Sequence, residues 1–186
     1  MKIELKKLIH ARSLSQETNA FTADLYVNGE KVATCKNSGT GGMTDIYPEY
    51  TTDEKKRKYY RNVITKAEIF CKGLPPHEYM YKNEKKQIKM DLEFFVNLEV
   101  EKDLKKKDID KVIKKLDKDA LNNIITISKK KLEDVKAGKS NELPYQMFGW
   151  KKPLADLPVG LIKMQLPAIQ AKLKGDEFIY NKNIPQ

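Results

Sequence analysis

The amino-acid sequence predicts one α+β domain, with an N-terminal antiparallel β-meander packed on several helices. Apolar residues alternate with a period of two near the start of the chain, and from about residue 60 they recur at helical spacing. The length of 186 residues suits a single domain that buries about 70 % of its unfolded surface. We expect the meander over residues 1–50 and a mainly helical, Lys-rich part over 51–140. Residues 141–186 should form a Pro-rich loop, a short helix and a short C-terminal strand.

The meander is predicted from three alternating segments. Ile3, Leu5 and Ile9 mark a first strand, and Phe21–Val27 is a second strand with strict alternation. The dipeptide Asn28-Gly29 predicts a type I′ hairpin turn, and residues 31–36 form the returning strand. Three antiparallel strands place the loops 11–19 and 37–47 at the same end of the sheet.

The middle of the chain predicts three helices. The first begins at a capping box formed by Thr51 and Glu54 and ends at Gly73. A second helix is expected over 84–101, and a third begins near Asp108 with an apolar stripe opposite its lysines.

The last third is read from fewer signals. Residues 123–128 could continue the helix or form a strand, and the proline-rich segment 143–158 predicts an ordered loop. A short helix is expected over 164–174 with Pro167 close to its first turn, followed by a strand at 178–180.

Composition excludes several classes of protein. The sequence has no run of 18 apolar residues and no apolar stretch near its start, so we expect neither a transmembrane helix nor a signal peptide. Two Cys and two His, widely spaced, predict neither a disulfide framework nor a zinc site. We therefore expect a cytoplasmic protein without membrane contact, metal or cofactor.

The charge is strongly basic, with 36 Lys and Arg against 26 Asp and Glu. Most of the excess lies in residues 51–140, and only three of the basic residues are Arg. Lys is a hydrated point charge and lacks the fork with which Arg reads guanine. We interpret most of this charge as solvated surface and expect any nucleic-acid binding to be weak and sequence-blind.

A glycine-rich loop is the most informative candidate site. Three glycines within four positions allow successive backbone N–H groups to converge on an anion, although the pattern is neither a P-loop nor a dinucleotide fingerprint. The alternative is a connection that simply needs glycine. The candidate ligand-binding residues are those of the loop, a cation from the facing loop and two from the first helix: Arg12, Lys36, Asn37, Ser38, Gly39, Thr40, Gly41, Gly42, Arg57 and Arg61.

Residues 15–29, SQETNAFTADLYVNG, followed by Gly41-Gly42, carry a resemblance. They resemble the start of small uncharacterised proteins encoded in phage and prophage genomes, over about the first 50 residues. The resemblance implies a phage-associated origin in a host bacterium and a role against that host. The resemblance implies no catalytic residues for this chain.

Three functional hypotheses follow. The first is a phage-type, non-catalytic counter-defence protein whose loop end engages a host protein or sequesters an anionic nucleotide signal. The second is a nucleic-acid-binding protein that uses the Lys-rich helices. The third is a small enzyme acting on a phosphorylated substrate, with Glu17, Asp24 and Asp45 as acid and base; neither His10 nor His77 lies in a catalytic motif. The sequence is compatible with either a monomer or a homo-oligomer.

Overall fold

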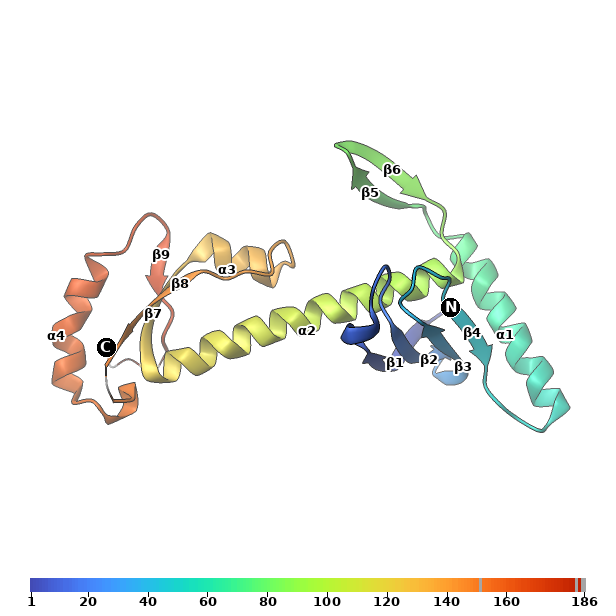
Figure 1. Cartoon of the computed structure of the whole chain (residues 1–186), viewed down its shortest axis with the longest axis horizontal. Coiled ribbons are helices and arrows are strands. Elements are labelled where there is room, and N and C mark those ends of the chain that lie inside the picture. Colours follow the sequence, from blue (N-terminus) through green and yellow to red (C-terminus); the bar gives the residue numbers. More distant parts are fainter. Residues whose placement is uncertain (151, 183, 185–186) are drawn as a thin grey trace. The chain divides into compact units, whose positions relative to one another are not determined.

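The computed structural model describes residues 1–150, 152–182 and 184, and it is an α+β fold (Figure 1). The chain divides into two compact units, Met1–Lys102 and Asp103–Gln186, which we call unit 1 and unit 2. Each unit is described by itself, and the expectation of one domain over the whole chain stays a prediction.

Unit 1 is built on a four-stranded antiparallel sheet. Its strands are β1 (Ile3–His10), β2 (Phe21–Val27), β3 (Glu30–Asn37) and β4 (Asp45–Pro48), in the order β1-β2-β3-β4. The predicted meander is therefore confirmed, and the turn residues Asn28 and Gly29 have φ of 51° and 89°, as a type I′ turn requires. The expectation of a loop over all of 37–47 is wrong at its end, because β4 pairs with β3 from residue 45 onward.

Helix α1 (Glu54–Lys72) was predicted, but its N-terminal cap was not. The side chain of Asp53 accepts hydrogen bonds from the backbone N–H groups of Lys55 and Lys56, so Asp53 replaces the expected capping box of Thr51 and Glu54. The helix ends at Gly73 as expected, and its apolar face buries Ala67 and Cys71.

A β-hairpin lies where the start of the second helix was predicted. Strands β5 (His77–Tyr81) and β6 (Glu84–Ile88) pair with each other alone in a two-stranded sheet. The turn residues Lys82 and Asn83 have φ of 48° and 66°, which matches a two-residue hairpin turn and is incompatible with a helix.

One long helix replaces the remainder of the predicted second and third helices. Helix α2 (Leu92–Asn122) runs for 31 residues, because neither Gly nor Pro interrupts it and the carboxylates near Asp108 do not cap a new start. Asp91 caps its first turn by accepting from the N–H of Phe94 at 2.7 Å, and Glu68 of α1 accepts from the N–H of Leu92 at 2.8 Å.

Unit 2 holds a three-stranded antiparallel sheet of order β8-β7-β9. The ambiguous segment is strand β7 (Asn123–Ser128), and the expected closing strand is β9 (Glu177–Ile179). The expectation of a loop over 143–158 is wrong in part, since it contains strand β8 (Tyr145–Gly149) and a 3-10 turn, Leu154–Asp156.

Two helices cover this sheet. Helix α3 (Lys129–Lys136) was not predicted, and α4 (Val159–Gln170) begins five residues earlier than expected, after Pro158. Pro167 therefore lies near the end of α4 and not in its first turn. Both faces of β7 are buried: one packs among residues of α2 and α3, and the other packs among residues of α4 and the 3-10 turn.

Candidate functional site

The two polar loops meet at one end of the sheet of unit 1, as the strand directions predict. The backbone carbonyl of Gly39 accepts hydrogen bonds from the N–H groups of Gln16, Glu17 and Thr18 at 2.9–3.3 Å. Gly39 has φ +86°, and a Cβ there would lie 2.4 Å from the carbonyl oxygen of Leu14. The interlocked loops therefore require glycine at this position.

Asn37 is the centre of the glycine loop. Its side chain is buried and accepts hydrogen bonds from the Thr18 hydroxyl at 2.9 Å and the Gly39 N–H at 2.8 Å. The same side chain donates to the Gly42 carbonyl and to the Thr44 hydroxyl, at 3.1 Å and 3.0 Å. All four bonds hold the loop shape, so Asn37 is occupied by its own loop and not free for a ligand.

Thr44 fastens the glycine loop to the first turns of α2. Its N–H donates to the Glu93 carboxylate at 2.8 Å, and its hydroxyl donates to the side-chain oxygen of Asn97 at 2.7 Å. This threonine is 5 % exposed. Glu93 and Asn97 were not predicted as site residues. The sequence predicted the wrong start for the second helix, so the side of that helix that faces the glycine loop could not be predicted either.

These contacts border an open pocket within unit 1. It has a volume of about 610 Å³, which falls within the range of small-ligand sites. Among the described residues, its walls include three carboxylates, from Glu17, Glu93 and Glu101, and no Lys or Arg. The walls also include the amides of Gln16, Asn19, Asn37 and Asn97 and the apolar side chains of Phe21, Met43, Phe94 and Val100.

The carboxylate of Glu17 lies against Gly41 of the glycine loop. Gly41 has φ +84°, and a Cβ on it would lie 2.2 Å from a carboxylate oxygen of Glu17. The missing side chain at Gly41 thus makes room for the carboxylate on the loop. A carboxylate of the facing loop therefore lies against the glycine loop, where the sequence predicted an anion.

The predicted anion-binding nest is used internally. The N–H of Gly39 donates to Asn37, and the N–H of Gly41 donates to the Thr18 hydroxyl at 3.3 Å. The hydroxyls of Ser38 and Thr40 bond to each other at 3.0 Å. The predicted geometry of converging free N–H groups is therefore absent at these two glycines.

The predicted cations are spread over unit 1. Arg12 lies on the exposed 3-10 turn Arg12–Leu14, and Lys36 is exposed near the end of β3. Arg57 donates to the carbonyl of Thr51, at the start of α1.

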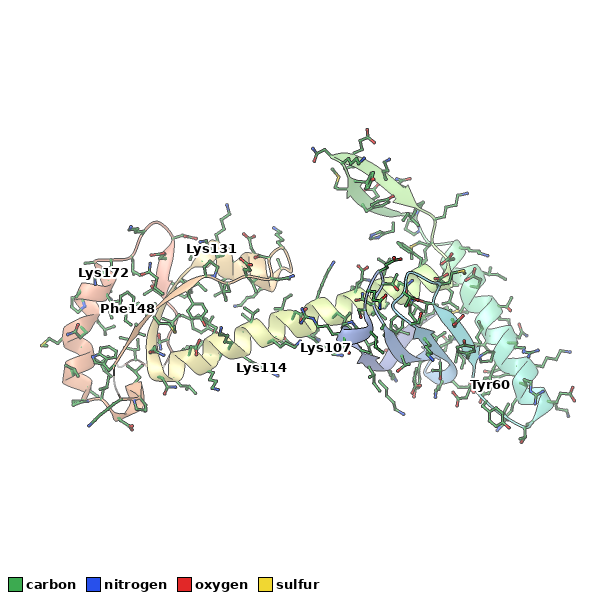
Figure 2. The ribbon with its side chains drawn as sticks, viewed as in Figure 1. Tyr60, Lys107, Lys114, Lys131, Phe148 and Lys172 are labelled. Atoms are coloured by element: carbon green, nitrogen blue, oxygen red, sulfur yellow. The ribbon has the colours of Figure 1, made fainter. Side chains whose placement is uncertain are left out.

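The two α1 arginines are not brought to the glycine loop. The hydroxyl of Tyr59 on α1 donates to Glu30 at 2.9 Å, and Glu30 begins β3, whereas the glycine loop follows its last residue, Asn37. Figure 2 marks this start of α1 by its neighbour, Tyr60. Arg57 and Arg61 lie two residues on either side of Tyr59 in the chain. They therefore lie near the β2–β3 turn, at the opposite end of β3 from the glycine loop.

One serine–histidine pair borders the pocket. His10 Nε2 lies 3.1 Å from the hydroxyl of Ser15, which also donates to the carbonyl of Ala11 and accepts from the N–H of Ala20. These hydrogen bonds to the backbone of Ala11 and Ala20 stabilise the conformation of the loop 11–19. No carboxylate orients the His10 ring among the hydrogen bonds of the described chain, so the pair lacks the third member of a catalytic triad.

The three carboxylates considered as acid and base do not converge. Asp24 lies in mid-strand between Lys31, at 3.0 Å, and Lys7, at 3.5 Å. Burial alone would raise the pKa of Asp24, but these two ammonium groups outweigh it and hold the pKa below its usual value. Asp45 accepts from the hydroxyl of Tyr47, and only Glu17 lines the pocket.

The described parts of the chain contain neither an exposed cysteine nor a cluster of side chains that could bind a metal ion. Cys35 and Cys71 are fully buried, and burial raises the pKa of these thiols to about 12 and about 11. The described residues hold no group of three or more His, Cys, Asp or Glu side chains placed to bind a metal ion. Within the same residues, no helix is long and apolar enough to cross a membrane.

Comparison with known proteins adds no family. Family models, curated proteins and solved structures all gave no match to this chain.

Proposed function

We propose that this chain is a non-catalytic binding protein that takes a basic side chain of a protein partner into the pocket of unit 1. The observation that carries this proposal is the charge of the walls, which include three carboxylates and no Lys or Arg. A host protein as partner, and a phage-type counter-defence role, are what the resemblance of the first 50 residues adds to it.

The walls suit a guanidinium or ammonium group. Glu17 and Glu101 supply acceptor oxygens. The side-chain oxygens of Gln16 and Asn19 can accept further N–H donors. Phe21 and Phe94 add aromatic carbon against which a cation or its alkyl stem can pack. Glu93 has one oxygen committed to Thr44 and keeps the other for a ligand.

The same walls disfavour an anionic nucleotide. A phosphate in this pocket would face carboxylates and would find the N–H groups of Gly39 and Gly41 already bonded. Burying an anion beside like charges is costly. Of the two partners expected from the sequence, the geometry thus supports the protein.

Titration of the full chain with small probes, followed by amide NMR shifts, tests the proposal. N-acetyl-arginine amide should shift the resonances of Thr18, Gly41 and Asn97, and N-acetyl-citrulline amide, its neutral isostere, should not. Replacing Glu17 and Glu101 together by Gln should weaken binding about tenfold or more, because each charge-assisted bond contributes about 1.5–3 kcal/mol.

The matched control changes two carboxylates of unit 2, Glu133→Gln with Glu142→Gln, and should leave the arginine shifts unchanged. Inorganic phosphate and AMP are the opposing probes. Shifts at the pocket with AMP and none with the arginine derivative would reverse the assigned charge of the ligand and overturn the proposal.

A further inference from the structure

The hairpin β5–β6 of unit 1 is exposed along almost its whole length. Every residue from Glu78 to Ile88 is exposed, and the hairpin pairs with no other strand of the described chain. A lone two-stranded hairpin is marginally stable in water. In Figure 1 it projects as a separate ribbon between α1 and α2. This position and exposure suit a surface that is completed by a partner.

The two faces of the hairpin differ in chemistry. Because side chains alternate along a strand, Tyr79 and Tyr81 share one face, and Met80 lies on the other. Tyr79 pairs with Lys86 across the hairpin, so Lys86 shares the tyrosine face. The register places Glu78 and Gln87 opposite each other on the second face, where their side chains bond at 3.1 Å.

The base of the tyrosine face is anchored, and its outer part is open. The His77 ring packs edge-on against Phe94 of α2, with ring centroids 5.6 Å apart. Beyond that anchor, Tyr79 is 36 % exposed and Tyr81 is 49 % exposed. Tyr79 and Tyr81 are two positions apart in the strand, which corresponds to about 6.8 Å. At this spacing, two neighbouring bases of an extended single strand can each stack on one ring.

Cations surround the outer ring. The ammonium groups of Lys82 and Lys86 lie 5.4 Å and 5.1 Å from the centroid of Tyr81, and that of Lys86 also lies 3.7 Å from the exposed carboxylate of Glu84. Residues 77–89 carry four Lys and two Glu in all. A base stacked on Tyr81 would bring its phosphates close to these two ammonium groups, and this charge complementarity favours a polyanion over an apolar or basic partner.

We propose that the tyrosine face of the β5–β6 hairpin binds single-stranded nucleic acid by stacking bases on Tyr79 and Tyr81. Lys82 and Lys86 neutralise the flanking phosphates. The contacts read no base edges, so binding is insensitive to sequence. This inference goes beyond the proposed function, because the hairpin residues that carry it do not line the acidic pocket.

Fluorescence anisotropy with the full chain and labelled dT15 tests the proposal. Wild type should bind dT15 more tightly than a duplex of the same length. The double variant Tyr79→Ala/Tyr81→Ala should lose at least tenfold in affinity, whereas Tyr79→Phe/Tyr81→Phe should stay within about twofold because phenyl rings still stack. Replacing Lys82 and Lys86 by Gln should flatten the slope of log affinity against log salt by about 1.4, at about 0.7 per phosphate contact.

Two controls separate the hairpin from other surfaces. Met80→Ala, on the second face of the same hairpin, and Tyr50→Ala, a loop tyrosine that is 86 % exposed, should leave the affinity within twofold. Lys114→Gln/Lys131→Gln tests the basic part of α2 that belongs to unit 2 and the helix α3 (Figure 2), and it should have a small effect.

Several outcomes would overturn the proposal. These are undetectable binding of dT15 and rU15 by wild type, equal affinity for single strand and duplex, or a greater loss in the Lys114/Lys131 variant than in the tyrosine variant. A comparison of dT15 with rU15 assigns the natural ligand to DNA or RNA. The Glu17→Gln/Glu101→Gln variant should bind dT15 at least as well as wild type, so the hairpin and the pocket can fail independently.

Discussion

Replacing Gly39 by Ala is the sharpest perturbation of the loop end. The added methyl group would lie 2.4 Å from the backbone oxygen of Leu14 and 2.8 Å from the Cβ of Ala20. Neither neighbour is the end of a flexible side chain, so the loop backbone itself must move. The φ of +86° adds strain for any residue with a Cβ.

The magnitude follows from these contacts. Left-handed backbone costs an L-residue about 1–2 kcal/mol. Displacing the loop weakens the three hydrogen bonds to the carbonyl of Gly39, each contributing about 0.5–1.5 kcal/mol. If two of the three are lost, the free energy of unfolding of unit 1 falls by about 2–5 kcal/mol, a large fraction of the stability of a typical domain.

Gly42→Ala is the matched control. Its φ is not in the left-handed region, and a Cβ there has no neighbour within 4 Å. The same chemical change three residues away should therefore alter stability by only a few tenths of a kcal/mol.

Two probes report the units separately in urea. The thiols Cys35 and Cys71 belong to unit 1, and Trp150 belongs to unit 2. In Gly39→Ala the urea midpoint for thiol labelling should fall well below that of wild type, and in Gly42→Ala it should not. Equal midpoints for the two alanine variants would refute the assigned role of Gly39 in locking the loops.

Two further predictions concern titratable groups. At pH 8 native Cys35 and Cys71 should be unreactive toward Ellman's reagent and should react only at the rate of unfolding, because burial raises the pKa of both thiols; rapid labelling without urea would contradict this. The hydroxyl of Tyr180 donates to Asp117 at 2.6 Å, and burial together with that bond raises its pKa to about 12. Its contribution to stability is fully present below the ordinary value of 10 and is lost as the pH rises from 10 to 12. Urea midpoints followed by Trp150 fluorescence should fall over this interval, and Tyr180→Phe should reduce the fall.

The N-terminal sheet could be predicted because its signals are local. Alternation in β2 follows from one buried face, and all four inward residues from Phe21 to Val27 are at most 4 % exposed. The hairpin turn follows from the φ that Asn28 and Gly29 adopt. Neither depends on distant parts of the chain.

The missed elements depend on tertiary context. In β7, Ile124 packs on one side of the sheet and Ile125 and Ile127 on the other, so the segment is apolar on both faces and shows no period of two. The hairpin β5–β6 is exposed on both faces, so no buried face marks its strands in the sequence. Its turn uses Lys82 in a left-handed conformation that a lysine rarely adopts.

The two loops of the candidate site could be located from the sequence, but the carboxylates that line the pocket beside them could not, and the anion site itself stays a prediction. Strand direction alone predicted that the glycine loop and its facing loop lie at one end of the sheet, and both loops line the pocket. The charge of the pocket, however, depends also on Glu93 and Glu101. These residues lie about 50 or more residues further along the chain, on a helix whose start the sequence predicted wrongly. The net charge of +10 belongs to the whole chain, and it gives no information on the sign of a pocket that has three carboxylates in its walls and no Lys or Arg. A chain of net positive charge can therefore carry a pocket lined by carboxylates, and in this chain the N–H of Glu17 bonds to the carbonyl of Gly39 while Gly41 leaves room for the Glu17 carboxylate.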